Sequence, residues 1–246
     1  MFSPVVRYSS IRTLLAIANQ YDMEIHQMDV ISAYLNGVLE DEIYMKQPPG
    51  YVDPKNPTKV CRLRKSSYGL KQSARCWNAS FDEYLKSEGY LSCPTDYCVY
   101  SKTIDESIIN ILIALFVDDT IIICNNADVL KEVKQKLNRR YEMQDQGRIH
   151  YFLGMSIKRD RAKKILTIDQ SLYIEKVLRI IESESPVDVT YYQAAIGSLI
   201  YAAISTRPDI SVVVGLLSQF MTNPGKEHWN GVKRVLRYLK GTLTLA

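Results

Sequence analysis

The sequence predicts an α+β fold followed by a helical region, and three observations lead to this prediction. Two apolar runs, 108–116 and 120–124, are separated by only three residues, which is typical of buried strands joined by a tight hairpin. Other strand patterns alternate with helical ones in the first part of the chain, and only helical patterns remain at its end. We therefore expect a mixed domain, a short linker and a helical region, at 1–180, 181–190 and 191–246.

The first part of the chain is predicted to alternate between helices and strands. Ser10 is in position to cap a helix, whose apolar residues recur at helical spacing: Ile11, Leu14, Leu15 and Ala18. Short strands are expected next, at 24–30, 42–45 and 60–63. A helix then begins near Leu70, and Gly89 is expected to end it. Its apolar face is made of Ala74, Trp77, Phe81, Tyr84 and Leu85.

The central hairpin is followed by a helix and by a second pair of strands. The helix, at 127–141, is expected to present Leu130, Val133 and Leu137 to the core. The strands, at 151–158 and 165–168, are joined by a charged turn. The remaining helices are predicted at 172–181, 192–204, 210–220 and 227–239. Acidic residues, serines and a proline interrupt the helical periodicity at 181–190, which is why we place the linker there.

Composition excludes several classes of protein. With 46% hydrophobic and 24% charged residues, the chain is neither disordered nor fibrous. The longest apolar run is far shorter than the ~20 residues that span a bilayer, so no membrane helix is expected. The five cysteines are odd in number and include no Cys-x-x-Cys pair, which favours free thiols in an intracellular protein, cytoplasmic or nuclear. The N-terminus shows no secretion signal.

A basic stretch lies between Asp53 and Asp82, where no acidic residue occurs. Its lysines and arginines are Lys55, Lys59, Arg62, Arg64, Lys65, Lys71 and Arg75. Tyr68 and Trp77 lie in the same stretch, so these residues could follow a phosphate backbone and stack on a base. The alternative is a solvated basic face. The same two interpretations apply to three residues of the last helix, Lys233, Arg237 and Lys240.

Asp118 and Asp119 are adjacent carboxylates at the tip of an apolar hairpin. Two like charges in a low-dielectric setting repel each other by several kcal/mol, so a compensating group is needed. Mg²⁺ is well suited, because it binds a few carboxylate oxygens and leaves its other positions to water and substrate phosphate. A third carboxylate from another strand is normally needed, and Asp29 is the best candidate. The alternative for an Asp-Asp pair is a solvated turn.

Several ordered motifs bear on these alternatives and leave the one for Lys233, Arg237 and Lys240 open. They are QMDV (27–30) with SAYLNG (32–37), EIYMKQPPGY (42–51), YGLKQS (68–73), FVDD (116–119), YFLGM (151–155), AIGSLIY (195–201), TRPDI (206–210) and NPGKEHW (223–229). In order and spacing, over nearly the whole chain, they resemble the reverse transcriptase of Ty1/copia-type retrotransposon Pol polyproteins. The resemblance implies a right-hand polymerase palm with partial fingers at 1–180, which is an antiparallel sheet with packed helices. It implies a connection or thumb-like region at 191–246.

The resemblance also implies the roles of individual residues. Asp29, Asp118 and Asp119 are the expected catalytic residues, and together with Val30 they are the expected ligands of two Mg²⁺ ions, with Mn²⁺ as the alternative metal. Tyr34 matches an aromatic gate that disfavours a 2′-hydroxyl, with a core tyrosine as the alternative. The expected nucleotide-binding residues are Tyr34, Tyr68, Gly69 and Gln72. The expected template or primer contacts are Lys65, Lys71, Arg75, Phe116, Val117, Leu153, Gly154 and Met155.

Leu153, Gly154 and Met155 match a hairpin that grips the primer end, although a purely structural hairpin is an equal local explanation. Phe116 stands where tyrosine is more usual. Gln144 stands where the family typically has lysine, a proton donor to the leaving pyrophosphate. The expected partners are dNTPs, a primed RNA or DNA template and other Pol segments such as integrase and RNase H, without a membrane.

The resemblance further implies a fingers segment ahead of Ser3, a longer connection at 181–190 and an RNase H domain after Thr242. We therefore expect an incomplete copy. Three hypotheses follow: an RNA-directed DNA polymerase domain, a catalytically defective or co-opted fragment that binds nucleic acid, or a structural role alone.

Overall fold

The computed structural model describes residues 3–104, 110–182, 189–243 and 245. It divides the chain into two compact units, Met1–Arg148 (unit 1) and Ile149–Ala246 (unit 2). This division precedes the linker predicted at 181–190, because helix α4 (Ser171–Glu182) shares its apolar core with the later helices. Most of that linker, residues 183–188, lies outside the described part of the chain.

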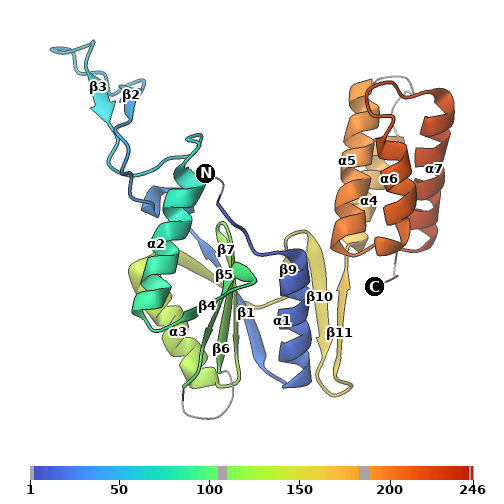
Figure 1. Ribbon diagram of the computed structural model, residues 1–246, viewed down its shortest axis with the longest axis horizontal. Coiled ribbons are helices and arrows are strands. Elements are labelled where there is room, and N and C mark those ends of the chain that lie inside the picture. The colour runs from blue at the N-terminus through green and yellow to red at the C-terminus, as the bar shows by residue number, and fades with distance from the viewer. Residues whose placement is uncertain (1–2, 105–109, 183–188, 244, 246) are drawn as a thin grey trace. The chain divides into compact units, whose positions relative to one another are not determined.

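Unit 1 is built on a six-stranded antiparallel sheet with the strand order β4-β5-β6-β7-β1-β8 (Figure 1). Its strands are β1 (Glu24–Val30), β4 (Leu91–Cys93), β5 (Asp96–Lys102), β6 (Ile111–Phe116), β7 (Asp119–Cys124) and β8 (Met143–Arg148). The predicted hairpin is confirmed: β6 and β7 pair along their length and are joined by Val117 and Asp118. Residues 108 and 109 of the predicted strand lie outside the described part.

Helices cover both faces of this sheet. The apolar sides of α2 (Ser73–Ser87) and α3 (Ala127–Arg140) form one core with alternate residues of the central strands, such as Ile113 and Ile122. Helix α1 (Tyr8–Gln20) lies on the other face (Figure 1). Because Met28 and Val30 belong to the α2–α3 core, Asp29 between them faces the α1 side of the sheet.

Most of the predicted helical faces are confirmed, but the cap is wrong. Ile11, Leu14, Leu15 and Ala18 are buried on α1, as are Leu130, Val133 and Leu137 on α3. Helix α1 begins at Tyr8, ahead of Ser10, and the Ser10 hydroxyl instead donates to Asp96 Oδ2 at 2.6 Å. The carboxylate of Asp96 also accepts a hydrogen bond from the Arg7 backbone N–H at 3.0 Å. Asp96, which lies on β5, therefore fixes the start of the helix.

Three strands escaped prediction. Strand β8 is almost entirely polar, and only Met143 is buried, so it carries no hydrophobic period. It forms because β1 offers it a free edge, with a bulge between Gln27 and Met28. Strands β4 and β5 mix polar and apolar residues, so they also lack a clear hydrophobic period and were not predicted.

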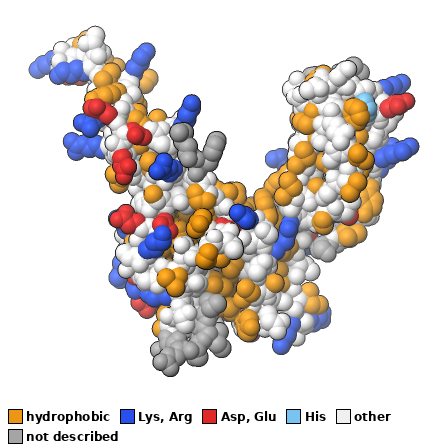
Figure 2. Space-filling view, in the orientation of Figure 1, with side chains coloured by type: hydrophobic (Ala, Val, Ile, Leu, Met, Phe, Trp, Pro, Cys, Tyr) orange, Lys and Arg blue, Asp and Glu red, His pale blue; other side chains and the backbone are white. Residues whose placement is uncertain are grey.

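A two-stranded ribbon projects from unit 1 (Figures 1 and 2). It consists of β2 (Tyr44–Lys46) and β3 (Val60–Arg62), and every residue of both strands is exposed. Residues 44–65 contain six lysines and arginines and one acid, Asp53, which gives a formal charge of +5. Since the whole chain has a charge of +4, this ribbon accounts for its basic character.

Unit 2 combines a small sheet with a helical bundle. Its strands are β9 (Tyr151–Phe152), β10 (Met155–Asp160) and β11 (Ile165–Asp169), in the order β11-β10-β9. The predicted strand at 151–158 is therefore broken, by a turn at Leu153 and Gly154. Helices α4, α5 (Val189–Ser205), α6 (Ser211–Ser218) and α7 (Lys226–Gly241) enclose an apolar core around Ile196, Leu199 and Val232.

The three basic residues of the last helix, Lys233, Arg237 and Lys240, are exposed on α7. None of the helices in the described ranges is long and apolar enough to cross a membrane.

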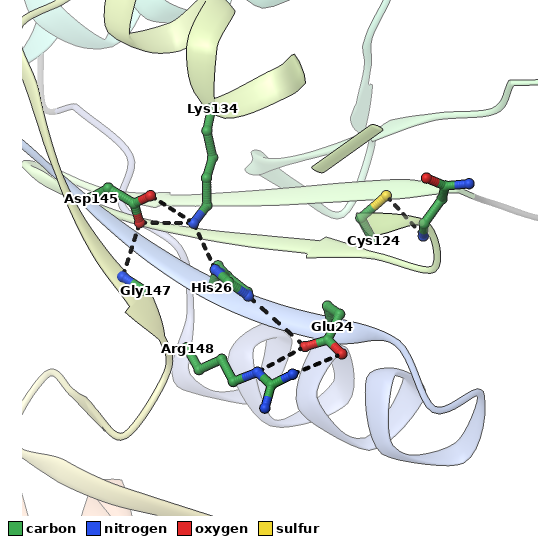
Figure 3. Close-up of polar contacts among 8 residues, drawn as sticks. Glu24, His26, Cys124, Lys134, Asp145, Gly147 and Arg148 are labelled. Atoms are coloured by element: carbon green, nitrogen blue, oxygen red, sulfur yellow. Dashed lines mark hydrogen bonds and ion pairs between the residues drawn. The ribbon is translucent and has the colours of Figure 1, made fainter. Parts of the chain in front are cut away.

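A polar network fastens β8 to its neighbours (Figure 3). Lys134 of α3 donates to both carboxylate oxygens of Asp145, at 2.7 and 2.9 Å, and to His26 Nδ1 at 2.6 Å. Arg148 and Glu24 form an ion pair at 3.3 Å. Because Lys134 can only donate, His26 Nδ1 must accept, and the imidazole is neutral. Burial and then the Lys134 charge lower the pKa of His26 below its usual value of 6.5.

This depressed pKa predicts that unit 1 loses stability in mild acid. The unfolded chain binds a proton at His26 below pH 6.5, whereas the folded chain resists it. The stabilisation is therefore complete above pH 6.5 and is lost as the pH falls through the lower, folded pKa. We expect the urea midpoint of unit 1 to decrease over that window. Trp77 fluorescence in a Trp229→Phe background would measure it, since each unit contains one tryptophan.

The control for this prediction is His26→Gln, which should flatten the pH profile between pH 5 and 8. Asp145 titrates in a different range: although burial opposes the effect, hydrogen bonds from Lys134 and the Gly147 amide hold the pKa of Asp145 below 3.8. An unchanged profile in His26→Gln would contradict the assignment to His26.

Candidate active site

The turn between β6 and β7 holds its backbone in an unusual conformation. Val117 has φ +55°, in the left-handed region that a β-branched residue rarely adopts. The indole Nε1 of Trp77 donates to the Val117 carbonyl at 2.8 Å, and the Val30 N–H donates to the Asp118 carbonyl at 2.9 Å. Buried elements on two sides therefore hold the strained turn in place. Strain of this kind is found where the position of a side chain matters for function.

The strand register places two of the predicted carboxylates side by side. Asp29 of β1 pairs with Asp119 of β7 on one side and with Gln144 of β8 on the other. Directly opposed residues of antiparallel strands share a face, so these three side chains form a row across the sheet. Phe116 pairs with Asp119 and continues the row onto β6. Gln144 is exposed, and a lysine at this position would lie next to Asp29.

Electrostatics confirm that the three carboxylates influence one another. Burial, followed by the charges of Asp29 and Asp119, raises the pKa of Asp118. Burial also raises the pKa of Asp119, a hydrogen bond from Gln27 opposes this, and the Asp29 charge adds to it. The folded protein thus keeps mutually repelling carboxylates together where β1 ends and β7 begins. A cation bound there would relieve their repulsion.

The two adjacent aspartates differ in their hydrogen bonds. Asp119 Oδ1 accepts from Gln27 Nε2 at 3.0 Å. Asp118 Oδ1 is buried and has no hydrogen-bond partner among the described residues. Gln27 belongs to the QMDV motif, and its contact with Asp119 was not predicted from the sequence. The one available signal was a polar residue at an inward position of a buried strand, two residues before Asp29.

The donor set fits a hard divalent cation. Within the described residues, no three His, Cys, Asp or Glu side chains are grouped as a ready-made metal site. Mg²⁺ does not require one, because it commonly binds one or two carboxylates and completes its shell with water and substrate phosphate. The orphaned, buried Asp118 oxygen is the observation that favours a cation, since such groups otherwise remain costly. The carbonyl of Val30 is the predicted backbone ligand.

Two tyrosines lie next to these carboxylates. The rings of Tyr34 and Tyr68 are in contact, with centroids 4.8 Å apart. Burial, then the charges of Asp118, Tyr34 and Asp29, raises the pKa of Tyr68, which places its hydroxyl near the site. Tyr34 lies in a short 3-10 helix, η1 (Ala33–Asn36), and packs against the core of unit 1. Gly69 has φ +91°, so it is needed there for its backbone conformation.

The start of α2 separates the other predicted contacts into two cavities. Lys71 lines a cavity of about 200 Å³ together with Tyr34, Trp77 and Val117. Gln72 and Arg75 instead line a different cavity, of about 320 Å³, where Gln72 donates to Asp41 at 3.2 Å. The structure therefore brings Lys71 towards the Val117 turn and directs Gln72 elsewhere.

Four remaining predicted residues belong to the ribbon and to unit 2. Lys65 is at the base of the ribbon, where it pairs with Val38. Leu153, Gly154 and Met155 belong to unit 2, where the Leu153 carbonyl accepts from the Tyr201 hydroxyl. Leu153 and Gly154 both have positive φ, and the Met155 side chain is 1% exposed, so it packs inside that unit.

Gly37 is a further site residue that sequence analysis did not single out. A Cβ added here would lie 2.8 Å from the Trp77 backbone nitrogen and 2.7 Å from the Ser66 Oγ. Its carbonyl accepts from the Ser66 N–H at 2.9 Å. The close approach brings the segment after Tyr34 directly against α2.

We expect Gly37→Ala to destabilise unit 1 by about 1–3 kcal/mol, because an extra methyl in a tight contact forces the backbone to shift. Urea unfolding followed by Trp77 fluorescence would measure the change. Gly197→Ala is the matched control, since its Cβ would meet nothing within 4 Å. Equal stability of Gly37→Ala and the parent protein would show that this contact is not tight in solution.

The sequence of this chain is similar to those of several known proteins. A family model described as reverse transcriptase (RNA-dependent DNA polymerase) matches residues 1–190. The chain is 40% identical over 269 residues to the retrovirus-related Pol polyprotein from transposon TNT 1-94 of Nicotiana tabacum, covering 98% of this chain and 20% of that protein. It is 39% identical over 260 residues to the corresponding polyprotein from transposon RE2 of Arabidopsis thaliana, covering 98% and 18%.

A shorter relative is matched over most of its length. The chain is 34% identical over 239 residues to a putative transposon Ty5-1 protein of Saccharomyces cerevisiae, covering 89% of this chain and 77% of that protein. In contrast, the chain spans about a fifth of the length of the two plant polyproteins.

Proposed function

The chain belongs to the reverse transcriptase (RNA-dependent DNA polymerase) family of copia-type Pol polyproteins, and from this we propose that unit 1 is a polymerase palm. It extends the 3′-hydroxyl of a primer by nucleotidyl transfer from a dNTP. The observation that carries the proposal is the row of Asp119 and Asp29 beside the strained Val117 turn, with the buried Asp118 oxygen left without a partner. Carboxylates converging on one edge of a rigid sheet are what this chemistry requires.

In this mechanism Asp29, Asp118 and Asp119 hold two Mg²⁺ or Mn²⁺ ions, with the Val30 carbonyl as a backbone ligand. When bound, the ions supply activation of the primer hydroxyl and neutralise charge on the leaving pyrophosphate. The sheet fixes Asp29 and Asp119 in register, and the bonds from Trp77 and Val30 fix the turn that carries Asp118. The residues are therefore organised before substrate arrives, which is how an active site avoids reorganisation during reaction.

Tyr34 and Tyr68 form the floor for the incoming sugar in this proposal. Tyr34, whose ring is held against that of Tyr68, is the proposed gate that disfavours a 2′-hydroxyl and so favours dNTPs. Gly69 and Gln72 complete the nucleotide-binding residues; for Gln72 this requires release from Asp41. Phe116, Val117, Lys71 and Arg75 contact template or primer near the turn, Lys65 does so from the ribbon, and Leu153, Gly154 and Met155 contribute the hairpin of unit 2.

A second candidate function is nucleic-acid binding without polymerisation. It is favoured by the charge of +5 on residues 44–65 and by Gln144, which cannot donate a proton as a lysine would. Integrase and RNase H segments of a Pol polyprotein are the proposed protein partners in either case.

Primer extension tests the first function directly. The purified chain is given an RNA template with a DNA primer, dNTPs and Mg²⁺, and the extended product is measured. Extension supports the polymerase. Absence of extension together with retained, salt-sensitive binding of the primed template would favour the second function.

The ribbon provides a quantitative prediction for the binding step. In Lys55→Gln/Lys59→Gln/Arg62→Gln, three positive charges are removed from an exposed surface. Each lost phosphate contact should lower the slope of log Kd against log salt by about 0.7–0.9, so the slope should fall by about 2–3. Fluorescence anisotropy across a salt series measures it. Lys226→Gln on α7 is a control for general charge, and a slope unchanged in the triple variant would exclude the ribbon as a phosphate contact.

A further inference from the structure

Gln27 is a buried polar residue whose amide points at the catalytic row. Its side chain lies on β1 and is 5% exposed. It shares a face with Asp29, two residues further along the strand. Its Nε2 donates to Asp119 Oδ1 at 3.0 Å, across 92 positions of sequence. An ionised carboxylate can only accept hydrogen bonds, so the orientation of this amide is fixed by its partner.

The register partners of Gln27 in the described sheet offer its amide no competing side-chain acceptor. Its register partners are Ile121 on β7 and Gly147 on β8. Neither side chain has a polar group that could accept from the amide. Burial removes water as an alternative partner, so the Asp119 carboxylate is the acceptor that the fold provides.

This bond makes the two adjacent aspartates unequal. One oxygen of Asp119 is already occupied, and the rotation of its carboxylate is restricted. Asp118 has a buried oxygen without any such partner among the described residues. A cation entering the site therefore meets an unpartnered oxygen on Asp118 and, on Asp119, a carboxylate that Gln27 has already oriented.

We propose that Gln27 is a positioning residue that orients Asp119 towards the metal ions by holding one of its carboxylate oxygens. This inference rests on the proposed two-metal function and deepens it, because it assigns a supporting residue to the cation site. Groups that hydrogen-bond to metal ligands fix the ligand geometry, and their loss commonly weakens metal binding by about 10–100-fold.

The test is Mn²⁺ binding by the full chain, followed through the electron paramagnetic resonance signal of free Mn²⁺. Gln27→Met keeps the length and burial of the side chain and removes the amide. We expect its Mn²⁺ affinity to fall about 10-fold, with little change in the urea midpoint. Gln27→Asn, whose amide ends one methylene short of Asp119, should lose affinity as well. Gln170→Met is the matched control, because Gln170 is a buried glutamine of unit 2.

A double-mutant cycle distinguishes positioning from packing. In an Asp119→Asn background, Gln27→Met should cause no further loss of Mn²⁺ affinity, because the residue through which it acts has already been changed. Additive losses, or wild-type affinity in both Gln27 variants, would overturn the inference while leaving the proposed function intact. If the parent protein shows no Mn²⁺ binding that depends on Asp118, the proposed metal site fails and the role of Gln27 fails with it.

Discussion

Replacement of Asp118 with asparagine is expected to lower the rate of primer extension by about 1,000-fold, or about 4 kcal/mol of transition-state stabilisation. The substitution keeps the size of the side chain and removes its negative charge. Asp118 carries the orphaned buried oxygen and lies in the turn that two buried elements hold. Its loss should therefore affect the chemical step. Single-turnover extension with saturating primed template measures this step separately from binding.

The fold should survive this change. Asp118 is repelled by Asp29 and Asp119, so removing its charge relieves repulsion, and we expect the urea midpoint of unit 1 to stay equal or rise. Asp128→Asn is the control, because Asp128 is an exposed acid in the first turn of α3. Undiminished extension by Asp118→Asn would mean that another group carries the chemistry.

The second large effect is expected for Trp77, which connects the core to the Val117 turn. Its side chain is 1% exposed, packs against Phe81 and Tyr141, and donates to the Val117 carbonyl. Trp77→Ala should destabilise unit 1 by about 3–5 kcal/mol, because it leaves a large cavity in the core. Urea unfolding followed by far-UV circular dichroism measures this loss.

Trp77→Phe separates packing from the hydrogen bond. It keeps an aromatic ring and leaves the Val117 carbonyl without its donor, which should cost about 1–3 kcal/mol. Primer extension should fall with it, since only the bond from the Val30 N–H still holds the turn. Trp229→Phe in unit 2 is the matched control: the Trp229 Nε1 is buried without a hydrogen-bond partner among the described residues, so no bond is lost. Equal effects of the two substitutions would argue against a role for the Val117 bond.

The sequence predicted elements well where the hydrophobic pattern was strong. The β6–β7 hairpin, the buried faces of α1 and α3 and the helices of unit 2 all follow from the spacing of apolar residues. Strand β8 could not be predicted in this way, because its residues are polar and its conformation is imposed by β1. Local propensity is weak wherever pairing with a distant strand determines the outcome.

The sequence predicted which residues make up the candidate site, but it did not predict how they are arranged in space. Motifs identified Asp29, Asp118 and Asp119. Their positions relative to one another depend on the pairing of β1 with β7, two strands that are about 90 residues apart in sequence. The role of Gln27 depends on the same long-range pairing. The positive φ of Val117 could not be predicted either, because valine rarely adopts that conformation unless the surrounding structure enforces it.

The projecting ribbon separates changes in surface charge from changes in the sheet. It leaves and rejoins unit 1 at a narrow neck, where the Ser66 N–H donates to the Gly37 carbonyl at 2.9 Å and Val38 pairs with Lys65. Between these points nearly all side chains are exposed, so substitutions there do not disturb the core. A substitution in the ribbon can therefore change its charge while the sheet that holds the carboxylates keeps its structure.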